Sequence, residues 1–347
     1  MLVKTIDIKE FRGIRRLTKP LELSRFNVII GRNNAGKTAI LEALYLLTIP
    51  FPTLPPPYNT SFKDFVEKLH GSPPSLIYGY FGEARITYEL ARKVEFEVGP
   101  EKWSVDNVEI TLDSQGNPKI QLNGKEVPLT TYQEFIKALG HGSERNITAL
   151  YIPNHTNYYE TLTDFVLKEE VLRWIEKQGI HRKVAEDFIS KAVYDRFTEV
   201  LVRRERLCLR KEVKDSEVKD STGPLYIDID SMGEGIKRFV LMYLTTEYLN
   251  PKMILWDDVE VAMHPSLLEL LIEWLSSSDR QVVLTTHSID LLYALTSAKT
   301  KPEDYRVIIL RKTRDDTVEW KAMELDEVEE LFESGVDVRK IIDELKL

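Results

Sequence analysis

Four residues near the start of the chain have the types and spacing of a phosphate-binding loop. Gly31, Gly36, Lys37 and Thr38 follow the pattern G-x-x-x-x-G-K-[ST], between a strand-like apolar run at 26–30 and a helix-forming stretch. The glycines let backbone N–H groups turn toward an anion, and the helix N-terminus adds partial positive charge at the same point. The lysine then reaches the terminal phosphates, and the threonine hydroxyl ligates Mg²⁺. The residues expected to contact a nucleotide are Gly31, Asn33, Asn34, Ala35, Gly36, Lys37 and Thr38.

Two later stretches end in side chains suited to the same chemistry. The run K-M-I-L-W at 252–256 predicts a strand covered on both faces, and Asp257 follows it. At the carboxyl edge of a parallel sheet, this acid would face Mg²⁺ beside the phosphate loop. A second apolar run, at 282–286, is followed by His287. The residues that follow these two predicted strands therefore predict a phosphate and metal site at one edge of the sheet.

The composition is that of a globular chain without an overall attraction to nucleic acid. Of 347 residues, 43% are apolar and 30% charged, and 47 basic against 56 acidic side chains give a net charge of −9. Contact with a polyanion would need a local basic patch. The single Cys208 excludes a disulfide framework and fits a reducing compartment. No apolar run reaches the ~18 residues of a membrane span and no signal-peptide pattern is present, so we expect a cytoplasmic protein without membrane contact. Scarce glutamine beside abundant Lys, Arg and Glu favours a thermophilic source.

The first half of the chain predicts strands around the phosphate loop and a β lobe. An alternating strand at 2–9 and a return strand at 21–30 lead to the loop. The proline-rich stretch 51–75 is expected to be a surface excursion without regular core structure. Repeated alternation over 82–128 predicts an antiparallel lobe with one exposed face.

The second half predicts a helical insertion and then the rest of an α/β core. Apolar spacing over 156–212 predicts paired helices, and the charged stretch 211–223 a flexible link. A further strand is expected at 305–311 and an acidic helical tail at 324–347. The expected parts are residues 1–155 with the phosphate loop and β lobe, the helical insertion 156–222, and residues 223–347 with the remaining motifs.

Three stretches together resemble the SMC/RecF/OLD-type ABC ATPases. I-K-E-F-R-G-I at 8–14 and N-V-I-I-G-R-N-N-A-G-K-T at 27–38 look like the opening of that class. S-M-G-E-G-I-K-R at 231–238 resembles the ABC signature, in a form similar to small ATPases that lack coiled-coil arms. The resemblance implies a P-loop ABC-type head with a mixed, largely parallel sheet, an antiparallel lobe and a helical insertion. No long heptad pattern or Cys-x-x-Cys accompanies these motifs, which excludes the long-armed and zinc-hook members, and we expect no OLD-type nuclease domain.

The resemblance also implies a site shared between two copies of the chain. In this class the signature of one subunit meets the γ-phosphate of ATP held by another, so Ser231 and Gly233 are expected to complete the site in an ATP-dependent homodimer. Arg12 falls where the family has an arginine near the nucleotide. Asp257 carries over as the acid of the Mg²⁺ shell, together with Thr38.

The acids after Asp257 depart from the family pattern in one place. Asp258 stands where the family has the Glu that orients the attacking water, and the shorter side chain predicts slow ATP hydrolysis. Glu260 matches the second acid, for which a structural capping role is an equal alternative. His287 falls at the histidine that hydrogen-bonds the γ-phosphate or the water. The glutamine that senses Mg²⁺ in ABC-type sites has no clear match, and three residues stay open for that role: Gln133, Asn154 and His155.

For an ATPase of the kind that this resemblance implies, three functions remain open. The first is a switch that controls a protein partner encoded nearby, in a defence or toxin-type module. The second is a DNA-repair or DNA-transaction clamp, and the third a nucleotide-binding switch with negligible hydrolysis. The net charge of −9 and the missing arms favour the first. Contact with DNA stays open through two basic clusters, although a solvated charged face explains each cluster more simply. The first cluster is Arg12, Arg15, Arg16 and Lys19, and the second is Arg203, Arg204, Arg206, Arg210 and Lys211.

Overall fold

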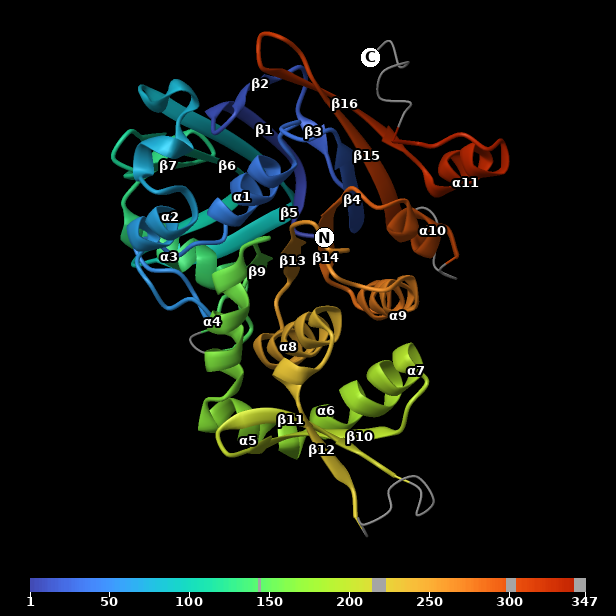
Figure 1. The fold of residues 1–347 in the computed structure, drawn as a ribbon. Helices are drawn as coiled ribbons and strands as arrows, with labels where there is room; N and C mark the ends of the chain where they lie inside the picture. Colours follow the sequence, from blue (N-terminus) through green and yellow to red (C-terminus); the bar gives the residue numbers. More distant parts are fainter. Residues whose placement is uncertain (143–144, 214–222, 298–303, 340–347) are drawn as a thin grey trace.

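One large mixed sheet runs through the molecule (Figure 1). The computed structural model describes residues 1–347 except 143–144, 214–222, 298–303 and 340–347. The strands of this sheet are β1 Val3–Phe11, β2 Ile14–Leu17, β3 Leu21–Glu22, β4 Phe26–Gly31, β5 Glu83–Val98, β6 Glu101–Asp113, β7 Pro118–Leu122, β8 Lys125–Val127, β9 Ala149–Ile152, β13 Met253–Trp256, β14 Gln281–Thr286, β15 Tyr305–Lys312 and β16 Thr317–Met323. Their order is β8-β7-β6-β5-β1-β2-β16-β15-β4-β14-β13-β9, with β3 beside β1.

The parallel half of this sheet positions the site. Strands β15, β4, β14, β13 and β9 lie side by side in that order and pair with one another in parallel. Every residue of β4, β13 and β14 is buried, as expected of strands covered on both faces. Because the carboxyl ends of parallel strands meet at one edge, Gly31, Asp257 and His287 are brought to the same edge. The predicted mixed α/β class is therefore confirmed.

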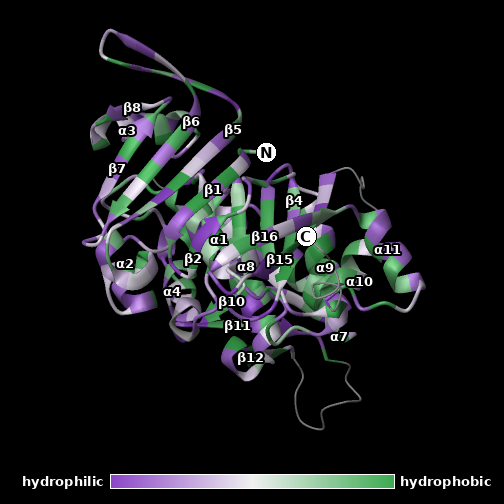
Figure 2. Ribbon diagram, turned by 90° about the horizontal axis from the view of Figure 1, so that it is seen from above, coloured by the Kyte–Doolittle hydropathy of each residue, from purple (hydrophilic) through white to green (hydrophobic). Residues whose placement is uncertain are grey.

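The antiparallel half contains the strands expected between residues 82 and 128. β5 pairs with both β1 and β6, and β7 and β8 extend the ladder. The β5–β6 hairpin projects beyond the rest of the sheet (Figure 2). The expected antiparallel lobe is thus present, as a continuation of the core sheet through β1.

Helices cover both faces of the sheet. The α-helices of the described residues are α1 Lys37–Leu46, α2 Phe62–His70, α3 Leu129–Ala138, α4 Thr156–Val166, α5 Glu169–Lys177, α6 Ile180–Lys183, α7 Ser190–Val193, α8 Glu234–Leu249, α9 Pro265–Ser276, α10 Ile289–Ser297 and α11 Leu325–Glu333. Of these, α5 and α6 pack against α8, and α7 packs against α9. Alternate residues of β4 contribute to different apolar clusters. Val28 and Ile30 pack with α4, α8, α9 and α10, whereas Ile29 packs with α1, α2 and α3. None of the helices in the described part of the chain has the length and apolar character needed to cross a bilayer.

The proline-rich stretch forms more regular structure than expected. Helix α2 begins after Ser61, whose hydroxyl accepts the N–H of Asp64. Phe62, Phe65 and Val66 are buried in the core. The expectation of an irregular excursion was wrong because the prolines flank a proline-free stretch whose apolar residues recur at helical spacing.

The helical insertion ends earlier than expected. After Val193 the chain turns through Tyr194 at φ 53 and forms a separate three-stranded antiparallel sheet: β10 Phe197–Arg203, β11 Arg206–Lys211 and β12 Leu225–Asp228. The expectation of helix over 197–211 was therefore wrong. The short apolar runs V-L-V before the hairpin turn and L-C-L after it are consistent with two buried strands joined by a tight turn. The link expected at 211–223 lies mostly outside the described residues.

The C-terminal part agrees with the expected elements. The strand expected at 305–311 is β15, and β16 follows it as a strand that was not expected. Helix α11 occupies the start of the expected helical tail and carries a capping box between Glu324 and Glu327. Residues 340–347 of that tail lie outside the described part of the chain.

Candidate nucleotide-binding site

The phosphate loop connects β4 directly to α1. At Gly36 φ is 101°, a left-handed conformation that favours glycine, and the helix begins at the next residue. Gly31 meets the backbone of β15 so closely that a Cβ there would lie 2.9 Å from the carbonyl oxygen of Leu310. The left-handed backbone conformation thus explains the glycine at position 36, and the close packing against β15 explains the glycine at position 31.

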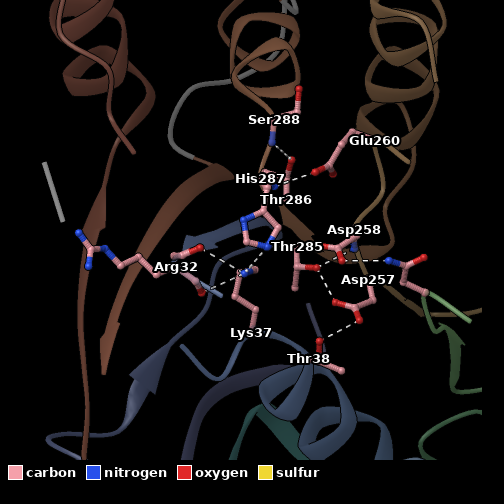
Figure 3. A network of polar contacts seen from close by, with 12 residues as sticks. Arg32, Lys37, Thr38, Asp257, Asp258, Glu260, Thr285, Thr286, His287 and Ser288 are labelled. Carbon is pink, nitrogen blue, oxygen red and sulfur yellow. Dashed lines mark hydrogen bonds and ion pairs between the residues drawn. The ribbon is translucent and has the colours of Figure 1, made fainter. Parts of the chain in front are cut away.

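Lys37 is buried at the centre of the site (Figure 3). Its Nζ lies 3.2 Å from the Gly31 oxygen and 3.4 Å from the Arg32 oxygen. The same atom lies 2.8 Å from Nε2 of His287. Because a lysine ammonium only donates, Nε2 of His287 is the acceptor in this contact. Burial lowers the pKa of Lys37, and the nearby acids Asp258 and Asp257 oppose that shift.

Asp257 is held by two hydroxyl groups. Thr38 donates to Oδ2 at 2.8 Å and Thr285 donates to Oδ1 at 2.6 Å. Burial raises the pKa of Asp257 to about 6; the Thr285 hydrogen bond opposes the shift, and the charge of Asp258 adds to it. Thr285 also accepts the backbone N–H of Asp258 at 2.8 Å.

The donors at this position fit a magnesium ion bound together with phosphate. Mg²⁺ in proteins takes one or two carboxylates, phosphate oxygens and several waters. Asp257 and Thr38 supply an oriented carboxylate and a hydroxyl on the phosphate-loop helix. Within the described ranges no group of three or more His, Cys, Asp or Glu side chains could hold a metal alone. A cation here would thus depend on phosphate and water for its other ligands.

Asp258 occupies an unusual backbone conformation. Its φ is 45°, in the left-handed region where Asp and Asn are more readily accommodated than long side chains. Its Oδ2 accepts a hydrogen bond from Asn154 at 3.0 Å. Its Oδ1 lies 3.9 Å from Nε2 of His287 and is buried without a hydrogen-bond partner. This backbone conformation gives a physical reason for Asp at a position where glutamate is usual.

Glu260 contacts the backbone of His287. Its Oε1 accepts the His287 N–H at 2.7 Å, and its Oε2 is buried without a hydrogen-bond partner. The histidine therefore has its main chain attached to Glu260 and its ring attached to Lys37 (Figure 3). This geometry gives Glu260 a structural contact, one of the two alternatives that its position leaves open.

Arg12 lies beside the phosphate-loop helix. Its Nε is 3.0 Å from Oε2 of Glu42, a buried residue one turn after Thr38. The other oxygen of Glu42 lies 2.9 Å from Nε2 of His70. Arg12 is thus held near the base of the loop by an ion pair, and it does not join the polar network of Lys37.

The signature residues form a separate, exposed feature. Ser231 ends a short 3-10 turn, and Gly233 precedes α8 as its N-terminal capping residue. Both are exposed and take no part in the polar network of Figure 3. The buried Gly235 packs against the segment after Asp257, where a Cβ would lie 2.2 Å from the carbonyl oxygen of Ala262. One chain therefore brings the phosphate loop and acids together, but not the signature.

The three residues left open for the glutamine role have different surroundings. Gln133, on α3, donates to the Phe51 oxygen at 2.7 Å, whereas His155 is the N-terminal capping residue of α4. Asn154 is the one that contacts Asp258. Thr285 is a residue that sequence reasoning missed: the structure pairs Trp256 with Leu284, which places Asp257 alongside Thr285.

The arginine cluster of the second sheet is largely neutralised. Arg206 lies 3.1 Å from Asp228, and Arg210 lies 3.4 Å from Glu199 and 3.0 Å from Glu212. In the same cluster, Lys211 pairs with Asp195 and Arg203 lies over the Tyr226 ring. In the N-terminal cluster, Arg16 donates to Thr317 and Lys19 lies over the Trp320 ring. The charges of Arg206, Arg210 and Lys211 are thus paired with acids, whereas Arg203, Arg16 and Lys19 contact uncharged side chains.

Sequence comparison gives a family and several relatives. The family model described as "AAA domain, putative AbiEii toxin, Type IV TA system" matches residues 26–293. An "ATP/GTP phosphatase" of Helicobacter pylori is 23% identical over 85% of this chain and 87% of its own length. An uncharacterized protein of Methanocaldococcus jannaschii is 34% identical over 31% of this chain and 99% of its own length. The "DNA double-strand break repair Rad50 ATPase" of Thermococcus kodakarensis is 30% identical over 40% of this chain, but only 15% of its own length.

Structure comparison gives the same class of fold. An Smc head bound to the C-winged helix domain of ScpA matches with a TM-score of 0.61 and 12% identity, over 94% of this chain and 100% of the other. An Smc head from Pyrococcus furiosus with an extended coiled coil, bound to the C-terminal domain of ScpA, matches with a TM-score of 0.62 and 11% identity, over 96% and 99%. Identities this low show the fold alone. Because the family model spans most of the chain, the protein belongs to the family described as "AAA domain, putative AbiEii toxin, Type IV TA system" and is an ABC-type ATPase of the SMC/RecF-like class.

Proposed function

We propose that the protein binds ATP with Mg²⁺ at the phosphate loop and hydrolyses it slowly. Lys37 would bind the terminal phosphates, with Gly31, Asn33, Asn34, Ala35 and Gly36 forming the cradle, and Thr38 and Asp257 would hold Mg²⁺. The cation would neutralise developing charge on the phosphates. The observation that carries this proposal lies at the carboxyl edge of the parallel strands, where Thr38 and Thr285 both donate to Asp257 and Lys37 contacts the Gly31 oxygen of the phosphate loop.

The slow rate is proposed from the geometry of Asp258. This carboxylate is one methylene shorter than glutamate, a loss of about 1.5 Å in reach, and a misplacement of ~1 Å can cost on the order of 100-fold in rate. Its left-handed φ and its hydrogen bond from Asn154 support a fixed orientation. Asn154 would then take the part of the missing glutamine, and His287, held by Glu260, would contact the γ-phosphate or the water.

Single-turnover hydrolysis tests this assignment. We expect wild-type turnover below ~1 s⁻¹, the bottom of the usual enzyme range. Asp258→Asn should remove most of the activity while ATP stays bound, since the water loses its acceptor. Asp258→Glu should leave the rate unchanged or raise it, if the longer side chain is accommodated at this φ. Full activity in Asp258→Asn would show that another group, Glu260 or His287, orients the water.

We further propose that the complete site forms between two copies of the chain. Ser231 and Gly233 are exposed at the N-terminus of the 16-residue helix α8, where unpaired N–H groups and the helix dipole favour an anion. Their position outside the network of Lys37 supports contact with ATP held by the other subunit. Nucleotide binding would then close a two-fold interface and hydrolysis would open it.

The proposed output is control of a protein partner encoded nearby, in a defence or toxin-type module. The family description, which mentions an AbiEii toxin, supports this output. The Smc heads that match this fold are bound to domains of another protein, ScpA, in their structures. The division of the chain into residues 1–155, 156–222 and 223–347 is also part of the proposal. Strand β12 lies in the third of these parts and pairs with β11 of the second. A pull-down in the presence of ATP, compared with ADP, tests for such a partner.

A DNA clamp is the second candidate, because one relative carries the name of a DNA double-strand break repair ATPase. Against it, Arg206, Arg210 and Lys211 already have acidic partners. A salt-titrated DNA-binding assay separates the candidates: phosphate contacts give a steep dependence of affinity on salt. Tight DNA binding that weakens steeply with added salt would favour the clamp. No DNA binding even at low salt would favour control of a protein partner.

A further inference from the structure

The main chain of His287 is attached on both sides by charged side chains. Glu260 accepts its N–H at 2.7 Å. On the other side, Nη1 of Arg339 donates to the His287 carbonyl oxygen at 3.0 Å, a contact across 52 residues of sequence. The ring of His287 contacts Lys37 at 2.8 Å. One residue at the edge of the phosphate site is therefore fixed from three separate segments of the chain.

Arg339 is itself preorganised for this contact. Its Nε lies 2.9 Å from Oδ1 of Asp337, and its Nη2 lies 2.7 Å from Oδ2 of the same carboxylate. The backbone N–H of Arg339 also donates to Asp337 at 3.0 Å. Between these two residues, Val338 is fully buried in the apolar cluster that contains α9 and α10. The planar guanidinium is therefore held in one orientation, with Nη1 directed at His287.

We propose that Arg339 is a positioning residue for His287, and that the segment Val336–Arg339 thereby sets the rate of ATP hydrolysis without contributing to ATP affinity. This inference rests on the proposed function, because His287 must act at the γ-phosphate or the water. Losing the Arg339 contact frees the carbonyl end of the His287 peptide while Glu260 still holds the N–H end. The ring then moves relative to Lys37, and small displacements of this kind act on the rate more than on binding.

Single-turnover hydrolysis and ATP titration on three variants test the proposal. In Arg339→Gln we expect the rate to fall about tenfold, the lower end of the ~10–100-fold cost of losing a supporting group at metal sites, with ATP affinity within about twofold of wild type. Arg339→Lys should be nearly as slow, because an ammonium cannot bind both Asp337 oxygens and the His287 oxygen in one plane. The matched control is Arg306→Gln, which removes a surface ion pair of 3.2 Å to Glu22 and should change neither quantity.

A double-mutant cycle separates positioning from general destabilisation. If Arg339 acts through His287, adding Arg339→Gln to His287→Ala should cause little further loss, whereas independent effects would multiply. An unchanged rate in Arg339→Gln, full recovery in Arg339→Lys, or independent effects in the cycle would each overturn the proposal. If His287→Ala alone hydrolyses ATP normally, the assigned role of His287 fails instead, so the two failures are distinguishable.

Discussion

Thr285 provides a test of the site that needs no nucleotide. Its buried hydroxyl donates to Oδ1 of Asp257 at 2.6 Å and accepts the N–H of Asp258 at 2.8 Å. Valine has nearly the same shape and β propensity but no hydroxyl. Thr285→Val therefore removes both hydrogen bonds with little change in volume.

The expected loss of stability follows from these two contacts. A hydrogen bond to a charged group contributes about 1.5–3 kcal/mol, and a buried N–H left without a partner costs about 1–3 kcal/mol. We therefore expect Thr285→Val to lower the free energy of unfolding by about 3 kcal/mol, at the lower end of the combined range because water can enter the site. The variant should also bind Mg²⁺ and ATP more weakly, since the carboxylate of Asp257 loses one of its two fixed contacts.

Equilibrium unfolding in urea, without nucleotide, measures the stability change. Thr148→Val is the matched control, because the hydroxyl of this fully buried threonine has no hydrogen-bond partner. We expect that variant to be as stable as wild type or slightly more stable. If Thr285→Val differs from Thr148→Val by less than about 0.5 kcal/mol, the typical scale of a neutral substitution, the reasoning about this network is wrong.

Three further predictions concern the phosphate loop, the signature helix and the metal. Lys37→Ala should lower ATP affinity by on the order of 100-fold, because charge-assisted contacts to phosphate are lost; tight binding in a nucleotide titration would contradict the loop assignment. Gly235→Ala should slow hydrolysis more than it weakens ATP binding, since its Cβ would lie 2.2 Å from the Ala262 oxygen and displace the segment that carries Asp258. If single-turnover rate and ATP affinity fell in parallel, Gly235 would not act on hydrolysis through the Asp258 segment. Chelation of Mg²⁺ with EDTA should stop hydrolysis, and added Mg²⁺ should restore it, whereas activity that persists in EDTA would exclude the proposed role of Asp257 and Thr38.

Much of the fold and of the site was readable from the sequence, because the parallel strands and the phosphate loop have local signals. The apolar runs before Gly31, Asp257 and His287 predicted three strands whose carboxyl ends meet, and the structure has them adjacent. By contrast, helix was expected over β10 and β11, since short continuous apolar runs cannot be assigned to helix or strand from periodicity alone.

The contacts that the sequence did not give are those between distant segments. The pair of Arg339 with His287 spans 52 residues, and that of Asn154 with Asp258 spans 104. No local pattern specifies such pairs, because they depend on the order of strands in the sheet and on the path of the C-terminal segment. The left-handed φ of Asp258 is likewise imposed by tertiary structure.

A complementation experiment tests the shared site most directly. Ser231→Arg keeps an intact phosphate loop, and Lys37→Ala keeps an intact signature, so only a mixed dimer contains one complete site. We predict that each variant alone hydrolyses almost no ATP. An equimolar mixture should regain roughly a quarter of the wild-type rate, because half of the dimers are mixed and each has one of two sites. A mixture no more active than its components, or a Ser231→Arg variant that hydrolyses ATP normally alone, would contradict a site completed between two copies of the chain.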